Sequence, residues 1–345
     1  MEALSYWRGC HEEPLEKAYS LLIKIAATHD RKAFCAKRLK RATSIIDKLK
    51  REKGMQLKRM QDIGGCRAIL SSKKRARKLI RGLTRHDDIR IRNDYMDTAK
   101  FDGYRSTHLI GKFSGIEDRQ YDIELQVRTA LQHSWATAVE IYDLFNSEAL
   151  KMDRGDEQWK KFFKVAGDIF EEIEQIAVLS GANSSRIVSG LTDRIVKKSS
   201  SQGKALKEKI REMYLLSKKL DVVVKFEGYT NSLSIAGDRI ENQNIEGFVL
   251  LTIDLNEKTV AEKYFEIGDF SKAKEEYLKA ELRTVNSEGV IVALVSTDAM
   301  GGVREAYPNY FADSHLFILA VRVATEAHRR INPSPISRLF DRLNS

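Results

Sequence analysis

Polar and apolar residues alternate between Tyr121 and Arg128, where the chain reads Tyr-Asp-Ile-Glu-Leu-Gln-Val-Arg. Because successive side chains of a strand point to opposite faces, this alternation predicts a half-buried strand. Its polar and apolar members then occupy opposite faces, with Glu124, Gln126 and Arg128 on one and Ile123, Leu125 and Val127 on the other. Such a polar row predicts the floor of a site for a charged ligand; for an isolated strand, a solvated face is the alternative.

The spacing of apolar residues predicts alternating helices and strands over the first 150 residues. Helices are predicted over Leu15–His29, Lys37–Lys53, Lys73–Leu83 and Thr129–Phe145, and strands over Ile63–Leu70, Ile89–Tyr95, His108–Phe113 and Tyr121–Val127. Alternation of this kind favours an α/β domain built around one main sheet.

The pattern changes twice beyond residue 150. Helical spacing covers 156–180 and 204–220, and the Ser- and Gly-rich ends of 181–203 predict hinges around a short helix. Strands are then predicted over Val222–Phe226, Phe248–Leu255, Val260–Phe265 and Val290–Ser296, with a helix over Ser271–Leu282. We therefore predict three parts: an α/β domain at 1–150, a helical segment and linker at 151–220, and a smaller α+β module at 221–345 whose candidate role is regulation.

Composition narrows the class of protein. The three cysteines, Cys10, Cys35 and Cys66, are an odd number without Cys-x-x-Cys spacing. This argues against a disulfide framework or a structural zinc site and favours a reducing compartment, so we expect a cytoplasmic protein. No stretch approaches 18 apolar residues, and the N-terminus lacks the apolar core of a signal peptide, so we expect no membrane partner.

The net charge of +10 is concentrated in one region of the chain. Between Arg31 and Arg59 there are twelve Lys and Arg residues against two acids, an excess equal to that of the entire chain, and a second basic cluster spans Lys73–Lys78. A solvated helix face is the simplest explanation of such a run. Its density favours instead a polyanionic ligand: nucleotide phosphates, RNA, or both.

Four segments follow one another in a characteristic order: Arg38–Arg51, Asp62–Arg67 (Asp-Ile-Gly-Gly-Cys-Arg), Gly103–His108 (Gly-Tyr-Arg-Ser-Thr-His) and Glu124–Thr129 (Glu-Leu-Gln-Val-Arg-Thr). In order and spacing they resemble the synthetase domain of the RelA/SpoT family of alarmone enzymes over roughly residues 30–145. The resemblance implies a nucleotidyltransferase-like mixed sheet flanked by helices. It also implies transfer of pyrophosphate from ATP to a 3′-hydroxyl, usually that of GDP or GTP.

The resemblance implies roles for individual residues. Asp62 and Glu124 would be the catalytic acids that hold Mg²⁺, and Glu124 would activate the attacking hydroxyl. Tyr104 would stack on the guanine. ATP would be bound by Arg38, Lys40, Ser44, Lys48, Arg51 and Arg67, and the acceptor by Arg92, Lys100, Tyr104, His108, Gln126, Arg128 and His133. For His133, helix capping or packing is an equal alternative.

The residue types fit this chemistry independently of the resemblance. Two nucleotides in one cleft bring several negative charges together, and phosphoryl-type transfer depends on positioning and charge stabilisation. Lys40, Lys48 and Arg51 lie near helical spacing, which predicts one basic helix face directed at the ATP phosphates.

Three functions remain open on the sequence. The first is synthesis of (p)ppGpp-type alarmones from ATP and a guanine nucleotide. The second keeps the chemistry but transfers pyrophosphate to the 3′ end of tRNA, as a toxin does, with the C-terminal module as an autoinhibitory element or the sensor of a protein regulator. The third is an inactive nucleotide sensor. Fewer than 40 residues precede Arg38, so we expect no N-terminal hydrolase domain of the family.

Overall fold

A computed structural model describes residues 2–40, 42–146, 150, 154–176, 184–197, 201–230, 247–254, 257, 259–284, 287, 290–296 and 314–332. The chain divides into two compact units. The first holds the described residues up to Lys100 and those from Arg105 to His133. The second holds Phe101–Tyr104 and the described residues from Ser134 onward.

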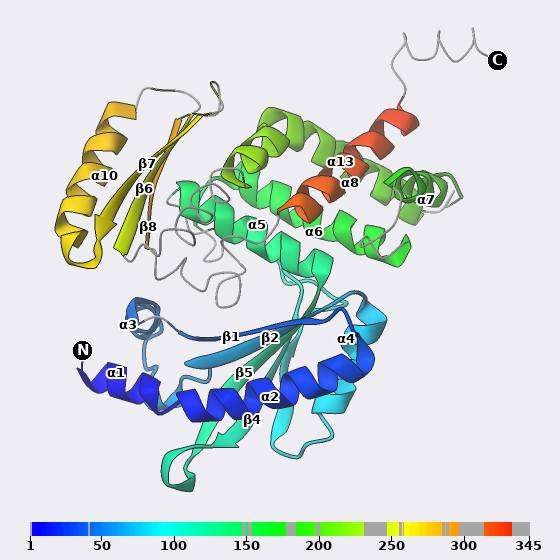
Figure 1. The fold of residues 1–345 in the computed structure, drawn as a ribbon. Coiled ribbons are helices and arrows are strands. Elements are labelled where there is room, and N and C mark those ends of the chain that lie inside the picture. The colour runs from blue at the N-terminus through cyan, green and yellow to red at the C-terminus, as the bar shows by residue number, and fades with distance from the viewer. Residues whose placement is uncertain are drawn as a thin grey trace, which may run out of the picture. The chain divides into compact units, whose positions relative to one another are not determined.

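A five-stranded mixed sheet forms the centre of the first unit (Figure 1). Its strands are β1 (Phe34–Leu39), β2 (Gly64–Leu70), β3 (Ile89–Asp94), β4 (Thr107–Ser114) and β5 (Gln120–Thr129). Their order across the sheet is β1-β2-β5-β4-β3. Only β2 and β5 among these neighbours run parallel. The predicted α/β class, a mixed sheet flanked by helices, is confirmed.

Helices and short 3₁₀ turns complete the first unit. They are α1 (Glu2–Gly9), α2 (Glu12–His29), α3 (Ala42–Arg51), η1 (Leu57–Arg59), α4 (Lys73–Leu83) and η2 (Ile116–Asp118). Helix α4 has the predicted bounds, because the Ser72 hydroxyl accepts a hydrogen bond from the Arg75 backbone N–H and so caps its first turn. Among the described residues, no helix is both long and apolar enough to cross a membrane.

The core of the first unit lies between α2, α4 and one face of the sheet. The apolar residues of β5 predicted to face inward, Ile123, Leu125 and Val127, are fully buried there. Helices α2 and α4 cover them with an apolar stripe that recurs at helical spacing: Leu15, Ala18, Leu22 and Ala26 from α2, and Ala76, Leu79, Ile80 and Leu83 from α4. With this face covered, the polar residues of β5 occupy the opposite face.

The predicted helix over Lys37–Lys53 is wrong at its start. Residues Phe34–Leu39 form strand β1, paired antiparallel with β2, and helix α3 begins only at Ala42. The spacing of apolar residues suited a helix, but pairing with β2 satisfies the backbone groups of this segment and overrides that local preference. Lysine and arginine are well tolerated on β1 because it is an edge strand.

The second unit contains a body of helices. They are α5 (Ala130–Asn146, of which the first turn belongs to the first unit), α6 (Glu157–Ile176), α7 (Ser184–Lys197), α8 (Ser201–Lys219) and α13 (His315–Ile331). The predicted strand over Val222–Phe226 is wrong, because residues 222–230 are helical. Phe226 and Tyr229 point into an aromatic core and are fully buried, three residues apart, which is helical rather than strand spacing.

Helix α13 packs on α6, α7 and α8 although it follows them by almost a hundred residues. Its Phe317 ring is fully buried, with centroids 5.5 Å from Phe170, 4.8 Å from Phe226 and 6.0 Å from Phe163. The predicted domain boundary at residue 220 stays a prediction. A boundary drawn from this packing would group α13 with the helices of residues 151–220.

A second, smaller sheet also belongs to this unit. It consists of β6 (Gly247–Asp254), β7 (Thr259–Glu266) and β8 (Val290–Ser296) in the order β7-β6-β8, all antiparallel. After the turn η4 (Ile267–Asp269), helix α10 (Phe270–Thr284) lies along one face (Figure 1). The core between this sheet and α10 consists of Leu250, Phe265, Ala273 and Val292. Of the four strands predicted for the α+β module, the last three are confirmed as β6, β7 and β8, whereas the first is helical.

Asp30 joins three elements of the first unit. Its side chain is fully buried and accepts hydrogen bonds from the backbone N–H groups of Lys32 (3.0 Å) and Ser71 (2.7 Å) and from Arg75 Nη1 (2.5 Å). Burial alone would raise the pKa of Asp30, but these hydrogen bonds outweigh it and hold the pKa below the ordinary value of 3.8. Asp30 therefore fixes the end of α2, the approach to β1 and the turn between β2 and α4.

We expect Asp30→Asn to lower the free energy of unfolding by about 1–3 kcal/mol at pH 7, because an amide NH₂ then faces buried donors. The depressed pKa means that the carboxylate stabilises the fold above about pH 3.8 and loses this effect as the pH falls through the native value. In urea titrations, the difference in free energy of unfolding between Asp30→Asn and wild type should therefore become smaller in acid. Asp87→Asn, at an exposed position after α4, should leave stability nearly unchanged.

Candidate active site

The strand registers bring polar residues of four strands onto one face of the five-stranded sheet. Gly65 and Arg67 of β2 pair with Glu124 and Gln126 of β5, respectively. On the other side of β5, His108 of β4 pairs with Gln126. Residues opposite each other in a sheet share a face. The same face also carries Ala36 and Arg38 of β1, Ile110 of β4 and Arg128 of β5. The polar row predicted from β5 is thus extended on both sides by its neighbours.

Two adjacent glycines shape this face in different ways. Gly64 points to the core, where an added Cβ would lie 2.7 Å from Ile123 Cδ1, so no side chain fits there. Gly65 points to the polar face and has room for a Cβ, so its lack of a side chain leaves the floor open. A cavity of about 360 Å³, open to solvent, lies here, lined by Ala36, Lys37, Arg38, Asp62, Gly65, Cys66, Arg67, Glu124 and Gln126.

Asp62 stands at the rim of this cavity between two lysines. It precedes β2 by two residues, and its carboxylate contacts Lys40 Nζ at 2.9 Å and Lys48 Nζ at 3.0 Å. All three side chains are about one-sixth exposed. Burial alone would raise the pKa of Asp62, but the two ammonium groups outweigh it and lower the pKa, so the carboxylate is ionised at neutral pH.

The position of Lys40 differs from the prediction. It follows β1 instead of lying in a helix, and its backbone N–H donates to Ile63 O at 2.7 Å. Lys48 lies in α3. The two lysines therefore meet at Asp62 from separate elements, and the predicted single helix face of Lys40, Lys48 and Arg51 is wrong. Arg51, the last residue of α3, instead contacts Glu52 at 3.5 Å.

Glu124 belongs to a chain of side-chain hydrogen bonds along the polar face. Its Oε1 lies 2.8 Å from His108 Nδ1, and its Oε2 accepts from Gln126 Nε2 at 2.9 Å. Gln126 Oε1 in turn accepts from Arg128 Nη2 at 3.1 Å. These contacts fix the orientation of the carboxylate.

The charge of Glu124 is set by opposing influences. Burial is the largest and raises its pKa, as does the negative charge of Asp62. The hydrogen bonds and charge of His108, with the bond from Gln126, prevail and hold the pKa below the ordinary 4.5. Glu124 is therefore ionised, and able to accept a proton, at neutral pH.

Asp62 and Glu124 are the two carboxylates among the described residues that line the cavity. Among the described residues, no three His, Cys, Asp or Glu side chains are grouped as a metal site would require. A hard cation such as Mg²⁺ is often held by one or two carboxylates, with water and substrate phosphates completing its oxygen ligands. Asp62 and Glu124, both ionised, fit a metal of this kind that arrives with a phosphate ligand.

The other predicted site residues are placed as follows. Arg38 and the largely buried Arg67 line the cavity, whereas Arg92 is exposed at the irregularity between Ile91 and Asn93 in β3. Lys100 is half-buried in the loop between β3 and β4. Ser44 lies in α3, but its side chain is outside the described part of the structure.

Tyr104 belongs to the second unit, where its ring meets Trp135 edge-on with centroids 6.3 Å apart. Gly103 before it has φ +96, and an added Cβ would lie 3.1 Å from Phe163 O, so glycine is required at this turn. His133 is buried in the first turn of α5, after reciprocal hydrogen bonds between Thr129 and Gln132 that cap this helix.

Sequence reasoning missed a group of polar residues at the loop between β3 and β4. Asp94, Asp97 and Arg105 form hydrogen bonds there with α4 and with the loop backbone. Asp94 ends β3 and Asp97 lies three residues further along, so the sequence offers no pattern that joins them to α4. Only the fold places the two segments side by side.

Comparison with known proteins agrees with this geometry. Residues 37–142 match the model of the region found in RelA / SpoT proteins. The chain is also 33% identical over 126 residues to the GTP pyrophosphokinase YwaC of Bacillus subtilis (strain 168), a match over 33% of this chain and 60% of that protein. The matched segment, called the RelA/SpoT region below because of this similarity, contains Asp62, Glu124 and most of the residues that line the cavity. The chain spans less than two thirds of the length of this relative.

Solved structures of small alarmone synthetases are similar to about half of this chain. The small alarmone synthetase 1 of Bacillus subtilis bound to pppGpp matches with a TM-score of 0.44 and 20% identity, over 51% of this chain and 94% of that one. The small alarmone synthetase 2 of the same organism matches with a TM-score of 0.42 and 26% identity, over 50% and 93% of the two chains.

We expect His108→Phe to raise the pKa of Glu124, because burial would then act without its main opposing hydrogen bond. Carboxyl ¹³C NMR titration of glutamate-labelled protein measures this directly, with Glu124→Gln identifying the resonance. His86→Phe, at an exposed position after α4, is the matched control. An unchanged Glu124 titration in His108→Phe would show that His108 does not set the charge of this carboxylate.

Proposed function

We propose that this protein transfers the pyrophosphate group of ATP to the 3′-hydroxyl of GDP or GTP, giving (p)ppGpp-type alarmones. The observation that carries the proposal is the pairing of two ionised carboxylates, Asp62 and Glu124, at one cavity of the RelA/SpoT region, with Lys40 and Lys48 held on Asp62. The GTP pyrophosphokinase YwaC, a relative with 33% identity in the matched segment, supports the reaction class.

The cations at this site suit the polyphosphate of ATP. Lys40 and Lys48 share a single carboxylate, so the cluster carries a net positive charge at the cavity. Phosphoryl-type transfer gains most from such fixed charges, because they oppose the charge that spreads over the phosphate oxygens in the transition state. We assign Arg38, Ser44, Arg51 and Arg67 to the same ATP site, and the planar guanidinium groups of Arg38 and Arg67 suit stacking on adenine.

The carboxylates would have complementary roles. Asp62 and Glu124 would hold Mg²⁺, which neutralises phosphate charge when bound. Glu124 accepts the proton of the attacking 3′-hydroxyl, and its hydrogen bonds with His108 and Gln126 keep the accepting oxygens in place. The guanine nucleotide would be bound by Arg92, Lys100, Tyr104, His108, Gln126, Arg128 and His133, with Tyr104 stacking on the base.

A second acceptor, the 3′ end of tRNA, is favoured by one observation. Lys53, Lys58 and Arg59 are exposed and have no carboxylate partner among the described residues, so they form a basic surface beyond the cavity. The basic cluster of α4 gives less support than its sequence suggested, because Lys73, Arg75 and Arg77 are all in ion pairs. In this alternative the C-terminal module would restrain the enzyme or sense a protein regulator.

We expect Asp62→Asn and Glu124→Gln each to reduce pyrophosphate transfer at least about a hundredfold, because each removes a charge that the chemistry requires. Transfer of label from γ-labelled ATP measures the effect, and circular dichroism checks the fold. Glu117→Gln, at an exposed position before β5, is the control and should retain activity. Near-normal turnover in either folded variant would remove that residue from the mechanism.

The acceptor is decided by offering γ-labelled ATP with GDP, GTP or total tRNA, and we expect label in the guanine nucleotide. The combined variant Lys53→Gln, Lys58→Gln and Arg59→Gln should leave this transfer unchanged. With a tRNA acceptor, the same variant would lose activity, and wild-type transfer would fall steeply between about 50 and 200 mM salt. Label in tRNA alone would replace the guanine nucleotide as the acceptor.

A further inference from the structure

Most of the basic cluster at the start of α4 is neutralised within the protein. Lys73 and Arg77 form ion pairs with Asp97, Arg77 also pairs with Asp94, and Arg75 pairs with Asp30. These contacts involve three of the five cations between residues 73 and 78. For Lys73 and Arg77, the structural partner is the end of β3 and the loop that follows it.

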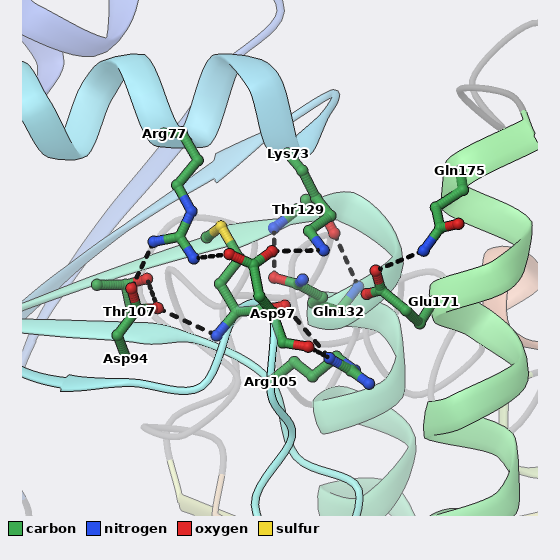
Figure 2. A network of polar contacts seen from close by, with 11 residues as sticks. Lys73, Arg77, Asp94, Asp97, Arg105, Thr107, Thr129, Gln132, Glu171 and Gln175 are labelled. Carbon is green, nitrogen blue, oxygen red and sulfur yellow. Dashed lines mark hydrogen bonds and ion pairs between the residues drawn. The ribbon is translucent and has the colours of Figure 1, made fainter.

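Arg77 bridges two carboxylates with one guanidinium group. Its Nη1 lies 2.5 Å from Asp94 Oδ2, and its Nη2 contacts Asp97 Oδ2 (Figure 2). Lys73 Nζ contacts the other oxygen of Asp97 at 2.8 Å. An isolated exposed ion pair adds little stability, but a planar guanidinium that joins two acids in a network fixes their relative position.

The two acids lie where the loop leaves β3. Asp94 ends that strand, and its Oδ1 accepts from Thr107 Oγ1 at 2.8 Å and from the Met96 backbone N–H at 3.2 Å. Thr107 begins β4, so Asp94 touches both ends of the loop. Hydrogen bonds from Arg77 and Thr107 overcome the effect of burial and lower the pKa of Asp94, so it remains charged at neutral pH.

The backbone closes the same loop from its other side. The Tyr95 N–H donates to Ser106 O at 2.8 Å, and the buried Arg105 donates from Nη1 to Asp97 O at 2.7 Å and Met96 O at 3.3 Å. Residues 95–97 and 105–106 are thereby joined as a neck. The chain between them carries Lys100 and Tyr104, the residues assigned to the acceptor.

We propose that Arg77 is a positioning residue for the acceptor nucleotide, which holds the neck of the 95–106 loop through Asp94 and Asp97. The inference rests on the proposed function, in which Lys100 and Tyr104 bind the guanine nucleotide. A loop that is already ordered does not lose conformational freedom when the acceptor binds. Acceptor affinity should therefore depend on Arg77, which orders the loop. Of the lysines assigned to ATP, Lys40 follows β1 and Lys48 lies in α3, so ATP binding should not depend on Arg77.

The first test measures the loop without any reaction. In Arg77→Gln, amide hydrogen exchange over 95–106 should be faster than in wild type by about tenfold, the effect expected when hydrogen bonds to charged groups are lost. Arg81→Gln is the matched control, one turn further along α4, exposed and without a carboxylate partner among the described residues. Equal exchange in Arg77→Gln and Arg81→Gln would overturn the inference.

The second test separates acceptor binding from ATP binding. Arg77→Gln should raise the KM for the guanine nucleotide about tenfold and leave the KM for ATP within about twofold. For Arg77→Lys, the KM for the guanine nucleotide should lie between those of Arg77→Gln and wild type, because one ammonium group cannot contact both carboxylates as the planar guanidinium does. Equal increases in both KM values would contradict a positioning role. If Arg77→Gln does not fold, Asp97→Asn replaces it, since the Asp97 side chain is 62% exposed.

Failure of the inference can be told from failure of the proposed function. If wild-type protein transfers no label to guanine nucleotides, the proposed function and the acceptor role of Arg77 both fall, whatever the exchange data show. If wild type is active but Arg77→Gln matches Arg81→Gln in both exchange and KM, the proposed function stands and the inference about Arg77 is wrong.

Discussion

The parallel pairing of β2 with β5 is the constraint on which the site depends. Its register sets Gly65 beside Glu124, which places an open floor next to a carboxylate. Asp62 precedes the same strand, so it is brought to the same end of the sheet. A slip of one residue would turn Glu124 toward the core and Leu125 toward the cavity, because side chains alternate between faces. The buried row of β5 against α2 and α4 makes such a slip costly.

Several basic residues of the first unit are paired with acids, but the ratio of cations to carboxylates differs from place to place. At the cavity, two lysines share Asp62, which leaves a net positive charge where phosphates would enter. Beside α4, Arg77 and Lys73 meet two acids, and the charges are matched. Fixed positive charge without a matching acid suits an anionic ligand, whereas matched charge suits an internal support. The same residue types thus serve different purposes according to their partners.

The aromatic core of the second unit shows how distant segments complete one body. Phe317 of α13 lies among Phe162, Phe163, Phe170 and Phe226, so the last described helix is part of the packing of α6. A truncation near residue 220 would remove a fully buried ring from that core and leave a large cavity, which is expensive in stability. The three-stranded sheet with α10 has a separate small core of its own.

Sequence patterns alone predicted four of the five strands of the main sheet (β2 to β5), helix α4, the alternation of β5 and, through four ordered segments, the similarity to the RelA/SpoT region. These features are local, because they depend on periodicity and short motifs. The sequence did not determine that 34–39 is a strand, that 222–230 is a helix, or that Arg77 faces Asp94 and Asp97. Those outcomes depend on partners far away in the chain: β2 for the first, Phe317 for the second and the β3–β4 loop for the third. Only the tertiary structure decided them, because local preference yields where distant segments bury apolar surface and satisfy hydrogen bonds together.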